Sequence, residues 1–189
     1  MTHRLHVVVC STRPGRIGLP IARWFEEEAR GHGPFDVELV DLAEFALPLF
    51  DEPKHPRLRQ YEHDHTKRWS AKVEAADAFV FVTPEYNFGP PPPLVNALNY
   101  LYVEWNYKPA AFVSYGGVSA GLRAVQMEKL TLTTLKMMPI IEAVAIPMVA
   151  QHMKDGAFEA TDMHRTSAVA LLDELGRWSA ALKPMRAAG

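Results

Sequence analysis

Five short apolar runs, rich in β-branched and aromatic residues, alternate along this chain with segments of helical periodicity. The runs cover residues 5–10, 37–42, 78–83 and 110–114, and a fifth lies within 140–149. The helical patterns cover 20–30, 69–76, about three turns between the third and fourth runs, 119–136 and 165–182. This alternation predicts an α/β fold, with a parallel sheet covered by helices on both faces. Because no internal repeat or linker interrupts it, we expect one domain over residues 1–189.

The charge balance and the single cysteine favour an ordinary globular protein. A net charge of -2 gives no electrostatic reason to expect a nucleic acid or an anionic membrane as partner. The apolar run at the N-terminus is too short for a signal peptide or a membrane span, so we expect a cytoplasmic protein. Cys10 ends a predicted buried strand, which favours an inert packed thiol; a redox role would require exposure and a lowered pKa.

The loop after the first strand is the first candidate for a ligand site, since ligands of open α/β sheets bind beyond the carboxyl ends of the strands. Its sequence, CSTRPGRIG over residues 10–18, offers two hydroxyls, two guanidiniums and two glycines just before a helix. A helix N-terminus with arginines nearby suits a phosphate. An ordinary strand-to-helix turn with two solvated arginines explains these residues about equally well.

The loops after the third and fourth strands add features that suit a planar ligand. TPEYNFG over 83–89 supplies aromatic and amide groups, and the prolines that follow at 90–93 stiffen the loop. SYGGVSAGL over 114–122 has two adjacent glycines that allow close approach, and Ser119 can cap the next helix. A stiff connector and a glycine turn are the simpler alternatives for each loop alone. Together the three loops indicate a phosphorylated flavin or a nucleotide.

Three segments, in this order and spacing, resemble the NADPH-dependent FMN reductases of flavodoxin-like fold, which include quinone, chromate and azo-dye reductases. The matching segments are STRPGRIG at 11–18, TPEYNFGPPPPLVNALNYL at 83–101 and SYGGVSAGLRAVQ at 114–126. The resemblance covers roughly residues 5–150 and implies a three-layer sandwich whose five-stranded parallel sheet, of order 2-1-3-4-5, carries FMN. It also implies NADPH or NADH as the donor, a small-molecule electron acceptor, and a homodimer or homotetramer.

The resemblance further implies which residues bind the cofactor. The phosphate would be held, partly through backbone amides, by Ser11, Arg13, Arg16, Ile17 and Gly18. The isoalloxazine ring would be flanked by Pro84, Glu85, Tyr86 and Asn87. The pyrimidine end of the ring would be approached by Tyr115, Gly116 and Gly117. Backbone N–H groups around Asn87 and Gly116–Gly117 would then stabilise negative charge on the reduced ring.

The resulting hypothesis is an FMN-dependent NAD(P)H oxidoreductase. It would pass a hydride from NAD(P)H through bound FMN to a quinone, an azo compound, a metal oxyanion or free flavin. The flavin supplies the chemistry, so we assign no acid–base residue and no metal. The alternatives are a non-enzymatic flavodoxin-like electron carrier, which the small net charge disfavours, and a flavin-binding regulatory protein.

Two further features have competing explanations. His55, His63 and His65 lie among acidic residues and could bind a metal, but a polar loop explains them as well. An apolar and aromatic face over residues 94–105 combines core packing with a predicted oligomer interface. A third pattern predicts the buried stripe of the last helix, at Val169, Leu172, Leu175, Trp178 and Leu182.

Overall fold

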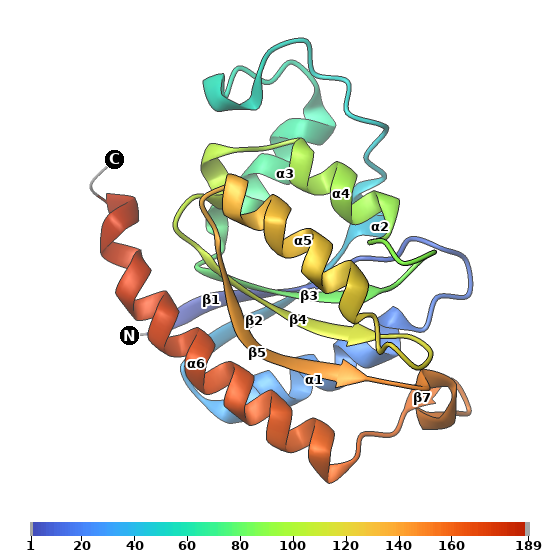
Figure 1. Ribbon diagram of the computed structural model, residues 1–189. Coiled ribbons are helices and arrows are strands. Elements are labelled where there is room, and N and C mark those ends of the chain that lie inside the picture. Colours follow the sequence, from blue (N-terminus) through green and yellow to red (C-terminus); the bar gives the residue numbers. More distant parts are fainter. Residues whose placement is uncertain (1, 188–189) are drawn as a thin grey trace.

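The computed structural model describes residues 2–187, which form three layers (Figure 1). A five-stranded parallel sheet of order β2-β1-β3-β4-β5 lies between α3, α4 and α5 on one side and α1 and α6 on the other. Its strands are β1 (His3–Val9), β2 (Phe35–Asp41), β3 (Ala78–Pro84), β4 (Pro109–Tyr115) and β5 (Met138–Ile146). The α/β class and the predicted strand order are confirmed.

The remaining elements cover the two faces and the edges of the sheet. The α-helices are α1 (Gly18–His32), α2 (Leu42–Phe45), α3 (Asp64–Ala75), α4 (Pro92–Asn99), α5 (Leu122–Thr134) and α6 (Asp162–Ala187). The short elements are the 3-10 turns η1 (Pro56–Leu58), η2 (Val103–Trp105) and η3 (Val149–His152), and the hairpin of β6 (Met153–Lys154) with β7 (Ala157–Phe158). Within residues 2–187, each helix is either too short or too polar to span a lipid bilayer.

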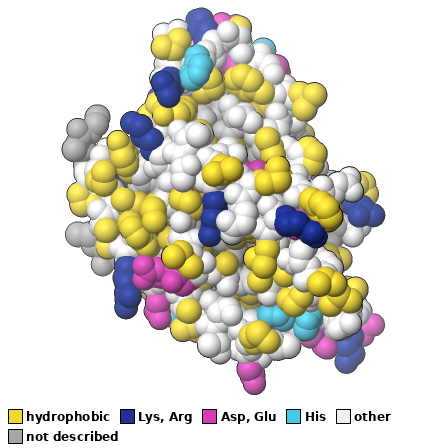
Figure 2. Space-filling model, in the orientation of Figure 1, with side chains coloured by type: hydrophobic (Ala, Val, Ile, Leu, Met, Phe, Trp, Pro, Cys, Tyr) yellow, Lys and Arg dark blue, Asp and Glu magenta, His cyan; other side chains and the backbone are white. Residues whose placement is uncertain are grey.

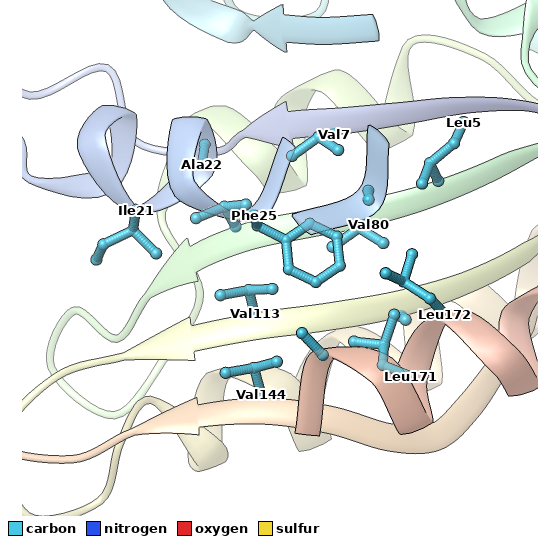
Figure 3. Packing of buried hydrophobic residues seen from close by; sticks show 14 of the residues in the cluster. Leu5, Val7, Ile21, Ala22, Phe25, Val80, Val113, Val144, Leu171 and Leu172 are labelled. Carbon is cyan, nitrogen blue, oxygen red and sulfur yellow. The ribbon is translucent and has the colours of Figure 1, made fainter. Parts of the chain in front are cut away.

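The central strands are buried on both faces, which explains their uninterrupted apolar sequences. Every residue of β3 and of β4 is buried. On the face covered by α1 and α6, Val80 and Val113 pack with Phe25 and Leu171 (Figure 3). Each such large side chain contributes about 1.5–3 kcal/mol when it leaves water. This core fixes the positions of the strand ends, where the candidate loops begin.

Most of the apolar face over residues 94–105 belongs to the core, as expected, while Tyr102 is half-buried and Val103 is 37% exposed, so the predicted interface on the remainder stays a prediction. Leu98, Leu101 and Trp105 are all buried. The helix is also shorter than the three turns predicted, because α4 ends at Asn99. Beyond it, the indole N–H of Trp105 donates to the Leu98 carbonyl at 3.2 Å, while the Tyr100 hydroxyl donates to the Pro48 carbonyl at 3.0 Å.

The C-terminal third also differs from the sequence prediction. The β6–β7 hairpin was not expected, since its strands of two residues are too short to show a period. In α6 the buried stripe includes Leu171, whereas Val169, which was predicted to be buried, is 45% exposed. Leu172 and Leu175 are buried as predicted, so the stripe is confirmed at those two positions and wrong at Val169.

Candidate functional site

Three loops leave the carboxyl edge of the sheet side by side and, together with Val149 of η3, border a half-open cavity of about 260 Å³. The parallel registers align Val9 with Val82 and Pro84 with Tyr115, so the strands end at the same level. The cavity lies in the region where the sequence predicted a ligand. It is lined by Arg13, Gly15, Arg16, Ile17, Pro84, Glu85, Tyr86, Tyr115, Gly116 and Val149.

Most of the predicted cofactor residues meet at this cavity. Eight of them line it: Arg13, Arg16, Ile17, Pro84, Glu85, Tyr86, Tyr115 and Gly116. Ser11 lies beside them, since its hydroxyl is 2.7 Å from the Tyr86 hydroxyl. Asn87 and Gly117 belong to the same loops, and Gly18 is the first residue of α1, but none of the three lines the cavity. Gly15 and Val149 also line the cavity but were not predicted; Val149 follows β5, where no polar or glycine-rich pattern marks a site.

The N-terminus of α1 is suited to an anion. Its N-cap, Ile17, makes no side-chain cap hydrogen bond, and its first turn contains no acidic residue. The first N–H groups of the helix therefore have no side-chain acceptor of the usual kind, and the helix dipole favours negative charge there. Arg13 in the same loop is exposed, and it forms no ion pair with any carboxylate among residues 2–187.

Arg16, in contrast, is already paired within the fold. Its guanidinium binds the Asp41 carboxylate, whose other oxygen accepts from the Ala43 backbone N–H at 3.0 Å and so caps α2. The β1–β2 register causes this pairing, because it sets Asp41 opposite Val9 at the base of the loop. Among the three guanidinium nitrogens of Arg16, only Nε is buried and has no hydrogen-bond partner within the described residues. Arg16 therefore brings less uncompensated positive charge to the cavity than Arg13.

Tyr115 forms a buried wall of the cavity that depends on two glycines. A Cβ at Gly18 would lie 2.5 Å from the Tyr115 hydroxyl, and a Cβ at Gly121 would lie 3.0 Å from the Tyr115 carbonyl oxygen. Gly121 also has a φ of +80°, in the left-handed region that favours glycine. Around Gly117, where close approach was expected, an added Cβ would meet nothing within 4 Å. Burial raises the pKa of Tyr115, so its hydroxyl stays protonated.

The loop after β3 contains a tight two-residue turn. Tyr86 and Gly89 exchange two backbone hydrogen bonds of 2.8 and 2.9 Å. The residues between them, Asn87 and Phe88, have φ angles of 50° and 69°. These are the positive angles of a type I′ turn. The turn presents Tyr86 to the cavity and leaves the Phe88 ring 63% exposed.

Glu85 ties this loop to the start of α5. Its carboxylate accepts from Nε and Nη2 of Arg123 at 2.8 and 2.6 Å, and from the Ser119 hydroxyl at 3.1 Å. The hydrogen bond from Arg123 lowers the pKa of Glu85. Ser119 therefore does not cap α5 as expected; the N-cap is Gly121, without a side-chain bond. Arg123 was not predicted, because its partner is 38 residues away in the sequence.

The other residues singled out in the sequence have structural explanations. Cys10 is fully buried, which confirms a packed cysteine. Burial raises the pKa of its thiol, and the nearby carboxylates of Glu128 and Asp41 raise it further. His65 lies 2.9 Å from the Asp51 carboxylate and holds the loop of Asp51 against α3. Within residues 2–187 no group of three or more His, Cys, Asp or Glu is arranged to hold a metal ion.

Known proteins share both the sequence pattern and the fold of this chain. The family model of NADPH-dependent FMN reductases matches residues 3–151. An NAD(P)H-dependent FMN reductase of Schizosaccharomyces pombe is 39% identical over 166 residues, which cover 85% of this chain and 83% of the relative. A quinone reductase of Pseudomonas putida is 28% identical over 178 residues, or 91% and 92%. The flavoenzyme NAD(P)H:(acceptor) oxidoreductase FerB of Paracoccus denitrificans has the same fold, with a TM-score of 0.77 at 21% identity over 96% of this chain and 99% of that one.

Proposed function

The chain belongs to the NADPH-dependent FMN reductase family, and we propose that it is an FMN-dependent NAD(P)H oxidoreductase with its flavin in the cavity between the three loops. One observation supports placing the flavin in this cavity. The uncapped N-terminus of α1 and the walls formed by Tyr86 and Tyr115 line the same cavity. This arrangement fits a ligand with a phosphate at one end and a planar ring at the other.

The residues around the cavity have different roles in this proposal. The first N–H groups of α1 and the guanidinium of Arg13 hold the phosphate, with Nε of Arg16 as a further donor. Tyr86 and Tyr115 fix the plane of the ring. The Gly116 N–H already donates to the Ile146 carbonyl at 3.2 Å. The N–H groups of Asn87 and Gly117, which follow the lining residues Tyr86 and Gly116 in the sequence, would then stabilise the reduced flavin from the rim of the cavity. When bound, FMN would supply the redox chemistry, with NAD(P)H as the hydride donor.

The acceptor that we propose first is a quinone, because the Pseudomonas putida relative is a quinone reductase. An azo compound, a metal oxyanion and free flavin are the other candidates. The test loads the purified protein with FMN and follows NADPH and NADH oxidation with one acceptor of each class. Steady turnover with a quinone is expected. Bound flavin that is never turned over with any acceptor would instead favour an electron carrier or a regulatory protein.

We also propose that the protein forms a homodimer or homotetramer through the outer face of α5. Leu122, Met127 and Leu130 are 45%, 53% and 72% exposed on that helix, and Figure 2 shows hydrophobic side chains on the face that carries it. Exposed apolar side chains gathered on one helix are typical of a protein interface. Light scattering should give the mass of an oligomer for the wild type and a smaller mass for Leu130→Glu. Leu58→Glu, at a 57% exposed position in η1, is the control and should leave the mass unchanged.

A further inference from the structure

The turn at Tyr86–Gly89 has a conformation that its sequence does not favour. Type I′ turns prefer Asn-Gly at their two central positions, because both residues need a positive φ. Here the second position is Phe88, whose φ is 69°. A bulky side chain is rarely found in the left-handed region, since its Cβ crowds the backbone. Contacts outside the turn must therefore hold it in place.

Arg123 supplies those contacts from the first turn of α5. Its Cζ lies 3.7 Å from the centroid of the Phe88 ring, a cation–π geometry. The same guanidinium binds the Glu85 carboxylate on the other side of the turn. Core packing cannot replace this contact, because the Phe88 ring is 63% exposed. One side chain thus fixes both ends of the segment that presents Tyr86 to the cavity.

Arg123 also compensates the negative charge at the cavity. Among the described residues that line it, Glu85 alone is acidic. Its side chain is 8% exposed, so water screens it poorly. Without the Arg123 guanidinium, Glu85 would keep its hydrogen bonds from the Ser119 hydroxyl and the backbone N–H of residue 123, but no positive charge would offset it beside a ligand that carries a phosphate and gains negative charge on reduction.

We propose that Arg123 is a positioning residue for the flavin: by stacking on Phe88 and pairing with Glu85, it holds the left-handed turn in the geometry that places Tyr86 against the ring. The inference rests on the proposed function, since it assumes that FMN occupies this cavity. If it is right, FMN binding should no longer depend on Arg123 in a variant whose turn adopts this geometry without the stacking contact. Phe88→Gly is such a variant, because glycine reaches positive φ without a Cβ penalty.

The experiment measures the FMN dissociation constant by quenching of flavin fluorescence. Arg123→Ala should weaken FMN binding by about tenfold or more. Adding Phe88→Gly to that variant should restore most of the affinity, and the residual loss should reflect the uncompensated Glu85. Adding Phe88→Ala instead should restore little, because alanine also loses the ring but keeps the Cβ. Arg57→Ala is the matched control; Arg57 stacks on the Tyr102 ring at 4.5 Å, away from the cavity residues, and its loss should leave FMN binding unchanged.

The thermal midpoint of the FMN-free variants separates positioning from general stability. If Arg123→Ala lowers this midpoint but binds FMN like the wild type, Arg123 is only structural and the inference is wrong. The inference would also be overturned if Phe88→Gly and Phe88→Ala restored the FMN affinity of Arg123→Ala equally, or if neither restored it. A wild-type protein that binds no FMN would overturn the proposed function, and the inference with it, whereas normal binding by Arg123→Ala would overturn the inference alone.

Discussion

The carboxylate of Glu85 lies 2.6 Å from Nη2 of Arg123, so an ion pair links the loop after β3 to the first turn of α5. Glu85→Ala leaves the Ser119 hydroxyl and the Arg123 guanidinium without their acceptor. The free energy of unfolding should fall by about 1.5–3 kcal/mol in urea titrations of the FMN-free protein. Glu159→Ala, which removes an exposed partner 3.5 Å from Lys154, should change it by less than about 1 kcal/mol. Equal losses in the two variants would contradict the account.

Position 18 requires a glycine because the Tyr115 side chain lies against it. A Cβ at Gly18 would lie 2.5 Å from the Tyr115 hydroxyl and must displace that ring. Gly18→Ala should therefore weaken FMN binding and lower the free energy of unfolding by about 1–3 kcal/mol. Gly31→Ala in the same helix meets nothing within 4 Å and should raise the stability by about 0.5–1 kcal/mol. Similar effects of the two substitutions would show that Tyr115 does not need the space.

Glu128 should make the protein less stable as the pH rises. The side chain is 1% exposed on α5, and burial raises the pKa of Glu128 to about 7. The folded protein then retains a proton that the unfolded chain releases near pH 4.5, so stability is lost as the pH rises from about 4.5 to 7. Glu128→Gln cannot ionise. In urea titrations the free energy of unfolding of Glu128→Gln should exceed that of the wild type only slightly at pH 4 and by about 3 kcal/mol at pH 8. Parallel curves for the two proteins would contradict a buried acid.

Arg13 and Arg16 should differ in their effect on phosphate recognition. Arg13 is exposed, and it lacks an ion-pair partner within residues 2–187, whereas Arg16 is held by Asp41. Arg13→Ala should weaken FMN binding but leave riboflavin binding nearly unchanged, because riboflavin lacks the phosphate. Arg16→Ala should also destabilise the fold, since it leaves the buried Asp41 unpaired. Binding titrations with both flavins test this difference. If Arg13→Ala lost the same affinity for FMN as for riboflavin, the phosphate would bind elsewhere.

The sheet and the position of the cavity could be predicted because their signals are local. Each central strand is a continuous apolar run, and the carboxyl-edge rule then selects the loops. Eight predicted residues line the cavity for that reason.

The side-chain partners at the site could not be predicted, because they depend on how distant segments align. Asp41 reaches Arg16 through the β1–β2 register, and Glu85 meets Arg123 across 38 residues. Ser119 looked like a helix cap, but its hydroxyl donates to Glu85 instead. The positive φ of Phe88 had no sequence signal either, since the usual signal for such a turn is Asn-Gly.

The most direct test of the central claim is the visible absorption spectrum of the FMN-loaded protein in the absence of air, before and after NADPH is added. We expect the bands of a bound flavin, which bleach when NADPH is added and return when a quinone follows. Bound flavin that stays oxidised in excess NADPH and NADH would contradict the account, because the cavity would then hold the cofactor without receiving a hydride.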